Sequence, residues 1–143
     1  MATPKLLRFA LPMQVAAVCY RRRGNGVEFL LVNSNGGNKW TFPKGSPETT
    51  MSHSRAAEKE AWEEAGLVGT LREQPIGEYR FEKLGRTHRV VVFRMKVTKV
   101  KRDWPERDRR RRRWLRPDKA VDRIEDAQLR KIVDAVARLK RAA

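Results

Sequence analysis

The pattern of apolar and polar positions predicts strands at the start of the chain. Apolar residues dominate positions 14–21 and 27–32, and the turn sequence Gly24-Asn25-Gly26 lies between them. Such a turn between two apolar runs is typical of a β-hairpin. Further strands are predicted at 40–42, at 76–82 and at 89–97, with a basic turn at 83–88 and a last strand beginning at Trp114-Leu115.

Helices are predicted at two places between and after these strands. The first runs to Ala65, with Ser52 or Ser54 as its N-cap and Gly66 as its C-terminal glycine. Pro117-Asp118 opens a second helical region. One helical face near the end of the chain is marked by Leu129, Ile132, Val133, Val136 and Leu139. This order of elements predicts an α/β (α+β) fold with a mixed sheet packed between helices.

Length and composition favour one globular domain over residues 1–143. The chain has 143 residues, of which 40% are apolar, so a buried core is feasible. Residues 1–12 are expected to form a flexible N-terminal segment. The apolar stretch from Leu6 to Met13 is interrupted by Arg8 and Pro12, and it is too short for a signal peptide or a membrane span. The single cysteine, Cys19, fits a reducing compartment. We therefore expect a cytoplasmic protein that does not enter a membrane.

Charge is unevenly distributed in this strongly basic protein. The net charge of +16 predicts an affinity for polyanions, yet the first helix carries Glu60, Glu63 and Glu64. At spacings of three and four these carboxylates share one helix face, where each like-charge pair costs about 0.2–0.5 kcal/mol. A divalent cation bound by oxygen ligands is the simplest group that would offset this repulsion.

The segment from Gly45 to Leu67 resembles the Nudix box, G-x5-E-x7-R-E-U-x-E-E-x-G-U, where U is aliphatic. Gly45, Glu60, Glu63, Glu64, Gly66 and Leu67 are in register with this pattern. Two positions depart from it, since Met51 replaces the first glutamate and Lys59 replaces the arginine. The resemblance implies a Nudix-type α/β/α sandwich. In the family the first glutamate is peripheral to the metals, so Met51 bears on the bracing of the loop more than on the chemistry.

Three further segments are similar to one branch of the family. The lead-in Trp40-Thr-Phe-Pro-Lys-Gly45 resembles enzymes that act on diadenosine polyphosphates and diphosphoinositol polyphosphates. Residues 85–89, and Asp103-Trp104 with the arginine-rich run to Trp114, resemble the diphosphoinositol polyphosphate phosphohydrolases. That branch has basic residues where this chain has Pro12, Gln14, Asn35 and Gly36. A dinucleoside polyphosphate is therefore at least as good a candidate substrate.

The resemblance implies hydrolysis of a phosphoanhydride with Mg²⁺, for which Mn²⁺ is an expected substitute. It implies that Glu60 and Glu64 bind the metal, that Glu63 is the general base and a further ligand, and that the backbone carbonyl of Lys44 completes the metal shell. The substrate would be a small-molecule polyphosphate, with nucleic acid as a less favoured partner. The residues expected to bind it are Lys44, Gly45, Arg86, His88 and Arg89.

Several alternatives stay open at this level. The protein could instead remove pyrophosphate from RNA 5′ ends, or bind RNA without catalysis. The run Arg109–Arg113 is interpreted either as a solvated loop or as a contact for polyphosphate or nucleic acid, and a strand would place alternate arginines on opposite faces. Cys19, Trp40 and Trp62 are predicted to be core residues. Glu82 and Glu106 are further acids that no pattern supports as metal ligands.

Overall fold

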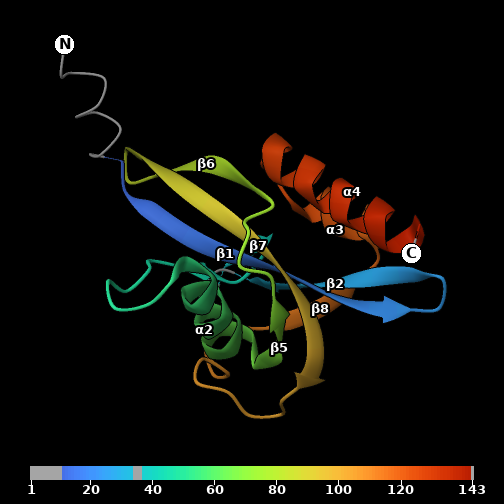
Figure 1. Cartoon of the computed structure of the whole chain (residues 1–143). Coiled ribbons are helices and arrows are strands. Elements are labelled where there is room, and N and C mark those ends of the chain that lie inside the picture. The colour runs from blue at the N-terminus through green and yellow to red at the C-terminus, as the bar shows by residue number, and fades with distance from the viewer. Residues whose placement is uncertain (1–10, 34–36, 143) are drawn as a thin grey trace.

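One mixed β-sheet lies at the centre of the molecule, with helices on both of its faces (Figure 1). The structure is a computed structural model, and it describes residues 11–33 and 37–142. Within these two ranges the strands are β1 (Met13–Arg23), β2 (Gly26–Asn33), β3 (Trp40–Thr41), β4 (Lys44–Gly45), β5 (Leu67–Leu71), β6 (Gly77–Lys83), β7 (Arg86–Val100) and β8 (Arg112–Leu115).

The sheet has the strand order β3-β2-β1-β7-β5, and β4, β6 and β8 pair with β1, β7 and β2. Strands β1 and β7 run parallel, with Met13 opposite Arg89 and Tyr20 opposite Lys96. The other pairs are antiparallel. Central parallel strands are covered on both faces, which explains why the two central runs, 15–20 and 90–93, are apolar without interruption.

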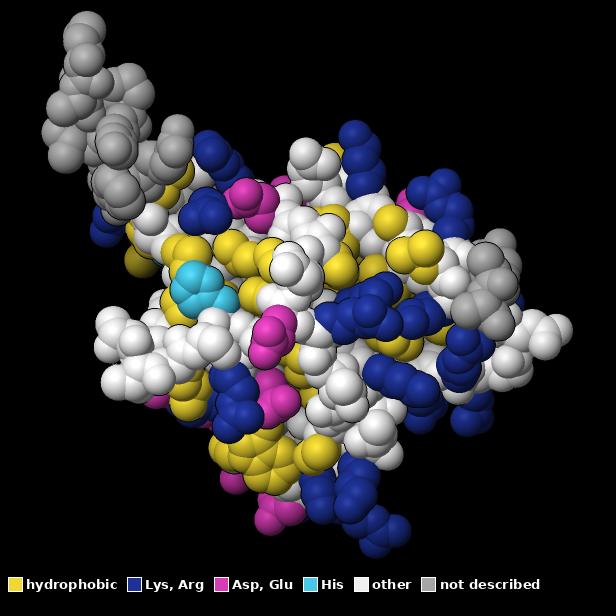
Figure 2. Space-filling model, viewed as in Figure 1, with side chains coloured by type: hydrophobic (Ala, Val, Ile, Leu, Met, Phe, Trp, Pro, Cys, Tyr) yellow, Lys and Arg dark blue, Asp and Glu magenta, His cyan; other side chains and the backbone are white. Residues whose placement is uncertain are grey.

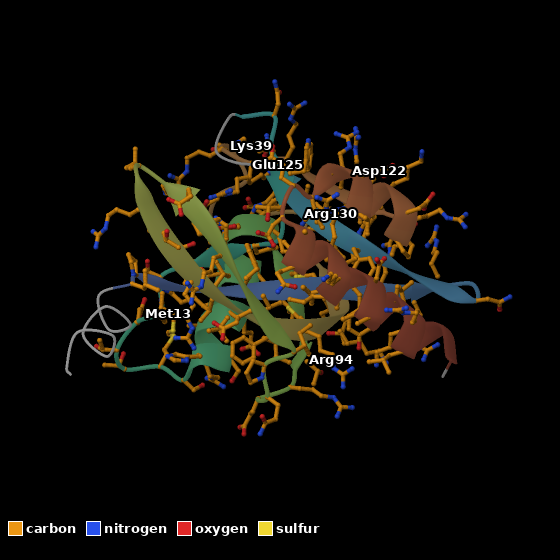
Figure 3. All side chains as sticks on the ribbon, turned by 90° about the horizontal axis from the view of Figure 1, so that it is seen from above. Met13, Lys39, Arg94, Asp122, Glu125 and Arg130 are labelled. Atoms are coloured by element: carbon orange, nitrogen blue, oxygen red, sulfur yellow. The ribbon has the colours of Figure 1, made fainter. Side chains whose placement is uncertain are left out.

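Alternate residues of β1 enter two separate cores. Val15, Ala17 and Cys19 face α2 (His53–Ala65). Ala16, Val18 and Tyr20 face the opposite side, which is covered by α3 (Pro117–Arg123) and α4 (Ala127–Ala142). Figure 3 looks onto this second side, where Lys39 and Glu125 form an ion pair at 3.9 Å. The predicted mixed sheet between helices is thus confirmed, as is the prediction that Cys19 is a core residue.

Three local predictions differ from the structure. Strand β5 was not predicted, and it follows directly after the left-handed Gly66 that ends α2. The basic turn predicted at 83–88 is confined to Leu84-Gly85, because pairing of β6 with β7 continues to Lys83 opposite Arg86. Trp62 was predicted to be buried but is 37% exposed.

Leu139 was predicted on the apolar face of the last helix, but 59% of its surface is exposed in α4. The predicted N-terminal segment 1–12 falls mostly outside the described residues, as do Asn35 and Gly36. Among the helices that the structure describes, none has the length and apolarity needed to cross a bilayer.

Candidate active site

Helix α2 is held close to the sheet by small residues on its inner face. Ala56, Ala57, Ala61 and Ala65 are all buried against the core that includes β1. Ser52 is the N-cap of the helix, and its hydroxyl oxygen accepts a hydrogen bond from the backbone N–H of Arg55. Because alanine lets the helix backbone approach the strands closely, the longer side chains along its edge are brought beside β4.

Two of the three predicted carboxylates meet the backbone of β4. The backbone N–H of Lys44 donates to Oε1 of Glu64 at 3.3 Å. Gly45 faces Glu60, and a Cβ at this position would lie 2.2 Å from Oε1 of Glu60. A side chain at position 45 would therefore displace the Glu60 carboxylate from the place that it has in this structure.

Glu60 and Glu64 are both held in positions unfavourable to their charged form. Burial raises the pKa of Glu60 to about 6, with Glu63 and Glu106 adding to the effect. Burial likewise raises the pKa of Glu64 to about 7, although the nearby Arg110 lowers it. Oε2 of Glu60 is buried without a hydrogen-bond partner among the described residues. A buried carboxylate, Glu64, and a partly buried one, Glu60, which is incompletely paired, form a site that a cation would stabilise.

Glu63 has different surroundings from the other two glutamates. Its Oε1 lies 3.0 Å from Nζ of Lys59, which precedes it by one helical turn. Lys59 also contacts Oε1 of Glu48, in the loop before α2, at 2.5 Å. The structure therefore brings Glu60 and Glu64 together and leaves Glu63 beside a lysine. Across residues 11–33 and 37–142, no three His, Cys, Asp or Glu side chains converge as metal ligands.

The C-terminus of α2 is capped by the charged segment 101–112. A helix leaves its last carbonyl groups without partners inside the helix. Here four successive carbonyls accept hydrogen bonds from this one segment. The donors are Glu106 N to Glu63 O at 3.0 Å, Trp104 Nε1 to Glu64 O at 3.0 Å, Arg112 Nη1 to Ala65 O at 2.7 Å and Lys101 N to Gly66 O at 2.9 Å.

Arg110 connects this segment directly to the carboxylates. Its Nη2 lies 3.4 Å from Oε2 of Glu64, and its Nε donates to Oε1 of Glu106 at 2.7 Å. Its Nη1 also donates to the backbone carbonyl of Asn33 at 2.9 Å. Sequence reasoning missed both Arg110 and Trp104 as parts of the site. The sequence held no local signal for them, because the segment follows strand β7 and Trp104 lies 40 residues from Glu64 in the chain.

Lys44 is a predicted substrate-binding residue whose side chain is largely surrounded by protein, and its pKa is shifted as a result. Burial lowers its pKa, while the negative charge of Glu64 acts in the opposite direction. Its Nζ lies 4.4 Å from the centre of the Phe81 ring. His88 stacks on the same ring with centroids 4.9 Å apart, and its Nδ1 is buried without a partner among the described residues. Lys44 and His88 thus share one aromatic neighbour.

The two remaining predicted phosphate ligands lie on opposite faces of β7. Because side chains alternate along a strand, Arg86 shares a face with His88 and is exposed. Arg89 is on the other face, where its Nε lies 2.5 Å from Oε2 of Glu78. The structure therefore places Lys44 and His88 against the same Phe81 ring and places Arg89 on the other face of β7.

Figure 2 shows how charge is distributed on the face that includes α2. Acidic side chains lie at the middle of this face, with Lys and Arg side chains on either side of them. Glu60 and Glu64, with Lys44 and Arg110 beside them, give the same alternation of sign at the site itself. Such an arrangement suits a cation bound to carboxylates and a polyanion bound next to it.

Comparisons with known proteins agree with this geometry. The family model of the NUDIX domain matches residues 11–136. Nudix hydrolase 12, mitochondrial, from Arabidopsis thaliana is 39% identical over 106 residues, which are 68% of this chain and 52% of that protein. Diphosphoinositol polyphosphate phosphohydrolase 2 from Rattus norvegicus is 32% identical over 110 residues, covering 76% of this chain and 60% of that protein. The chain spans 52% to 65% of the length of the first three such relatives.

A solved structure supports the same fold. The C. elegans Ap4A hydrolase superposes with a TM-score of 0.73 at 20% sequence identity, covering 90% of this chain and 98% of that one. The sheet between helices, the glycine and carboxylates of the box in register, and the match over residues 11–136 lead to one conclusion. This chain belongs to the NUDIX domain family.

Proposed function

We propose that this protein is a Mg²⁺-dependent pyrophosphohydrolase that cleaves a phosphoanhydride bond of a dinucleoside polyphosphate or a diphosphoinositol polyphosphate. The observation that carries the proposal is the carboxylate pair of partly buried Glu60 and buried Glu64 beside Lys44. The names of the rat relative and of the C. elegans neighbour support these two substrate classes. Buried Cys19 supports a reducing, cytoplasmic location.

The carboxylate pair fits a divalent cation on two counts. One oxygen of Glu60 is buried without a partner, and Gly45 leaves the space that this carboxylate fills. Glu60 and Glu64 would hold Mg²⁺, or Mn²⁺ in its place, with the Lys44 backbone carbonyl as a further oxygen ligand. The bound ion would supply a positive charge for the phosphate oxygens and would acidify water.

The protein's own residues would then bind the phosphate chain and move a proton. Lys44 and His88 would bind phosphate oxygens, with Arg86 at the exposed edge. Glu63, which is partly exposed, would accept a proton from the attacking water. The water oxygen forms a bond to phosphorus, the bridging phosphorus–oxygen bond breaks, and a phosphorylated product leaves. Arg89 would support the strand through Glu78.

A substrate screen with product identification tests this function. Wild type, Glu64→Gln and Glu58→Gln are each incubated with a diadenosine polyphosphate, a diphosphoinositol polyphosphate and a triphosphorylated RNA, with Mg²⁺ or with chelator. We expect Mg²⁺-dependent hydrolysis of one small polyphosphate, lost in Glu64→Gln and kept in Glu58→Gln. Equal rates in wild type and Glu64→Gln would exclude the metal role of Glu64. Preference for the RNA would favour the alternative that the net charge of +16 suggests.

A further inference from the structure

Lys59 joins the loop before α2 to the proposed general base. Its ammonium group contacts one carboxylate on each side, Glu48 at 2.5 Å and Glu63 at 3.0 Å. The hydrogen bonds to Glu48 and then to Glu63 raise the pKa of Lys59, so that it stays charged. An ammonium group has three donors and can serve two carboxylates at once. Lys59 is thus the bridge of a Glu48–Lys59–Glu63 chain.

Glu48 supplies a carboxylate that the box pattern expects three residues later. The box has a glutamate at position 51, where this chain has methionine. Met51 packs instead against the core under α2. Its backbone N–H donates to the carbonyl of Glu48 at 3.2 Å, so the two residues belong to one tight turn. A carboxylate from either position of this turn would lie next to the start of the helix.

We propose that Glu48 and Lys59 are positioning residues for Glu63, and that Glu48 has taken over the place of the glutamate missing at position 51. The inference rests on the proposed function. Lys59 and Glu63 are one helical turn apart, so their contact restricts the rotamers of the Glu63 side chain. Glu48 in turn holds Lys59 and fixes the loop that follows the Lys44–Gly45 strand.

The kinetic test removes the carboxylate of Glu48 and then restores one at position 51. Misplacing a catalytic group by about 1 Å costs up to about a hundredfold in rate, so we expect Glu48→Gln to lower kcat by about tenfold and to leave KM within about twofold. Adding Met51→Glu to Glu48→Gln should recover most of kcat, whereas adding Met51→Gln should not. Glu58→Gln is the matched control, because Glu58 makes no ion pair with the described residues.

Hydrogen exchange gives a second measurement that does not depend on turnover. Glu48→Gln should speed amide exchange in residues 46–51 without changing exchange within α2, and Met51→Glu should reverse the effect. The inference would be overturned if Glu48→Gln had the same kcat and the same amide exchange rates as Glu58→Gln. It would also be overturned if adding Met51→Glu to Glu48→Gln restored neither kcat nor slow exchange. A wild-type protein inactive on all polyphosphates would instead remove the proposed function, and the catalytic part of this inference with it.

Discussion

Glu64 gives the sharpest test of the site through the pH dependence of stability. Only 6% of its surface is exposed, and burial raises its pKa from 4.5 to about 7. A raised pKa means that the folded protein binds this proton more tightly than the unfolded chain does. The stabilisation is therefore complete below pH 4.5 and is lost as pH rises through about 7.

The expected size follows from the two pKa values. The difference between 4.5 and about 7 corresponds to about 3 kcal/mol of unfolding free energy. In Glu64→Gln the side chain at position 64 is neutral at every pH. The contributions of the other titrating groups to the unfolding free energy therefore cancel when the variant is subtracted from wild type. Without metal, the unfolding free energy of wild type minus that of the variant should fall by about 3 kcal/mol between pH 4.5 and pH 8.

Urea denaturation in the presence of a chelator measures this difference at several pH values. For a domain of this size, about 3 kcal/mol corresponds to a change in Tm of about 6–12 °C. Glu58→Gln serves as the control for the loss of one carboxylate from α2. Adding Mg²⁺ at pH 8 should stabilise wild type more than Glu64→Gln, since the ion binds the ionised form. A difference between wild type and Glu64→Gln that does not change with pH would refute the reasoning.

Two further predictions concern neighbours of this carboxylate pair. Arg110→Gln should lower metal-free stability at pH 8 by about 3 kcal/mol, because it leaves buried Glu64 without its cation. The side chain of Arg109 is 61% exposed, so Arg109→Gln should lower the unfolding free energy by less than about 0.5 kcal/mol. Equal losses of unfolding free energy in the two variants, measured by urea denaturation, would contradict this prediction. Gly45→Ala should reduce Mg²⁺-dependent hydrolysis by at least about tenfold, since the added Cβ displaces the Glu60 carboxylate. Gly26→Ala, where a Cβ meets nothing within 4 Å, is its control, and similar rates in both variants would count against the close approach.

The features that the sequence predicted well depend on local signals. Helix α2 has a serine before it and a glycine after it, and the structure shows both caps. The hairpin of β1 and β2 follows from two apolar runs around one turn. Gly45 was placed in the box by register alone and its contact with Glu60 was not predicted, whereas the structure shows that the missing Cβ leaves the space that the Glu60 carboxylate fills.

The features that were missed depend on contacts between residues far apart in the chain. Trp104 and Glu64 are separated by 40 residues, and Arg110 and Asn33 by 77. A charged segment after a strand carries no periodicity that would identify which helix end it caps. The Glu48–Lys59 pair escaped notice for a related reason, since a carboxylate displaced by three residues does not match a pattern read by position.

The run Arg109–Arg113 shows why neither interpretation of it is complete. Arg110 and Arg112 point inward, to Glu64 and to the Ala65 carbonyl. Arg113 lies over the Trp40 ring at 5.6 Å on the opposite face of β8, as strand alternation requires. Part of the basic charge thus offsets the carboxylates and carbonyls at the end of α2. Exposed arginines such as Arg113, which do not contact these groups, are the ones whose charge would act on a polyanion at the proposed site.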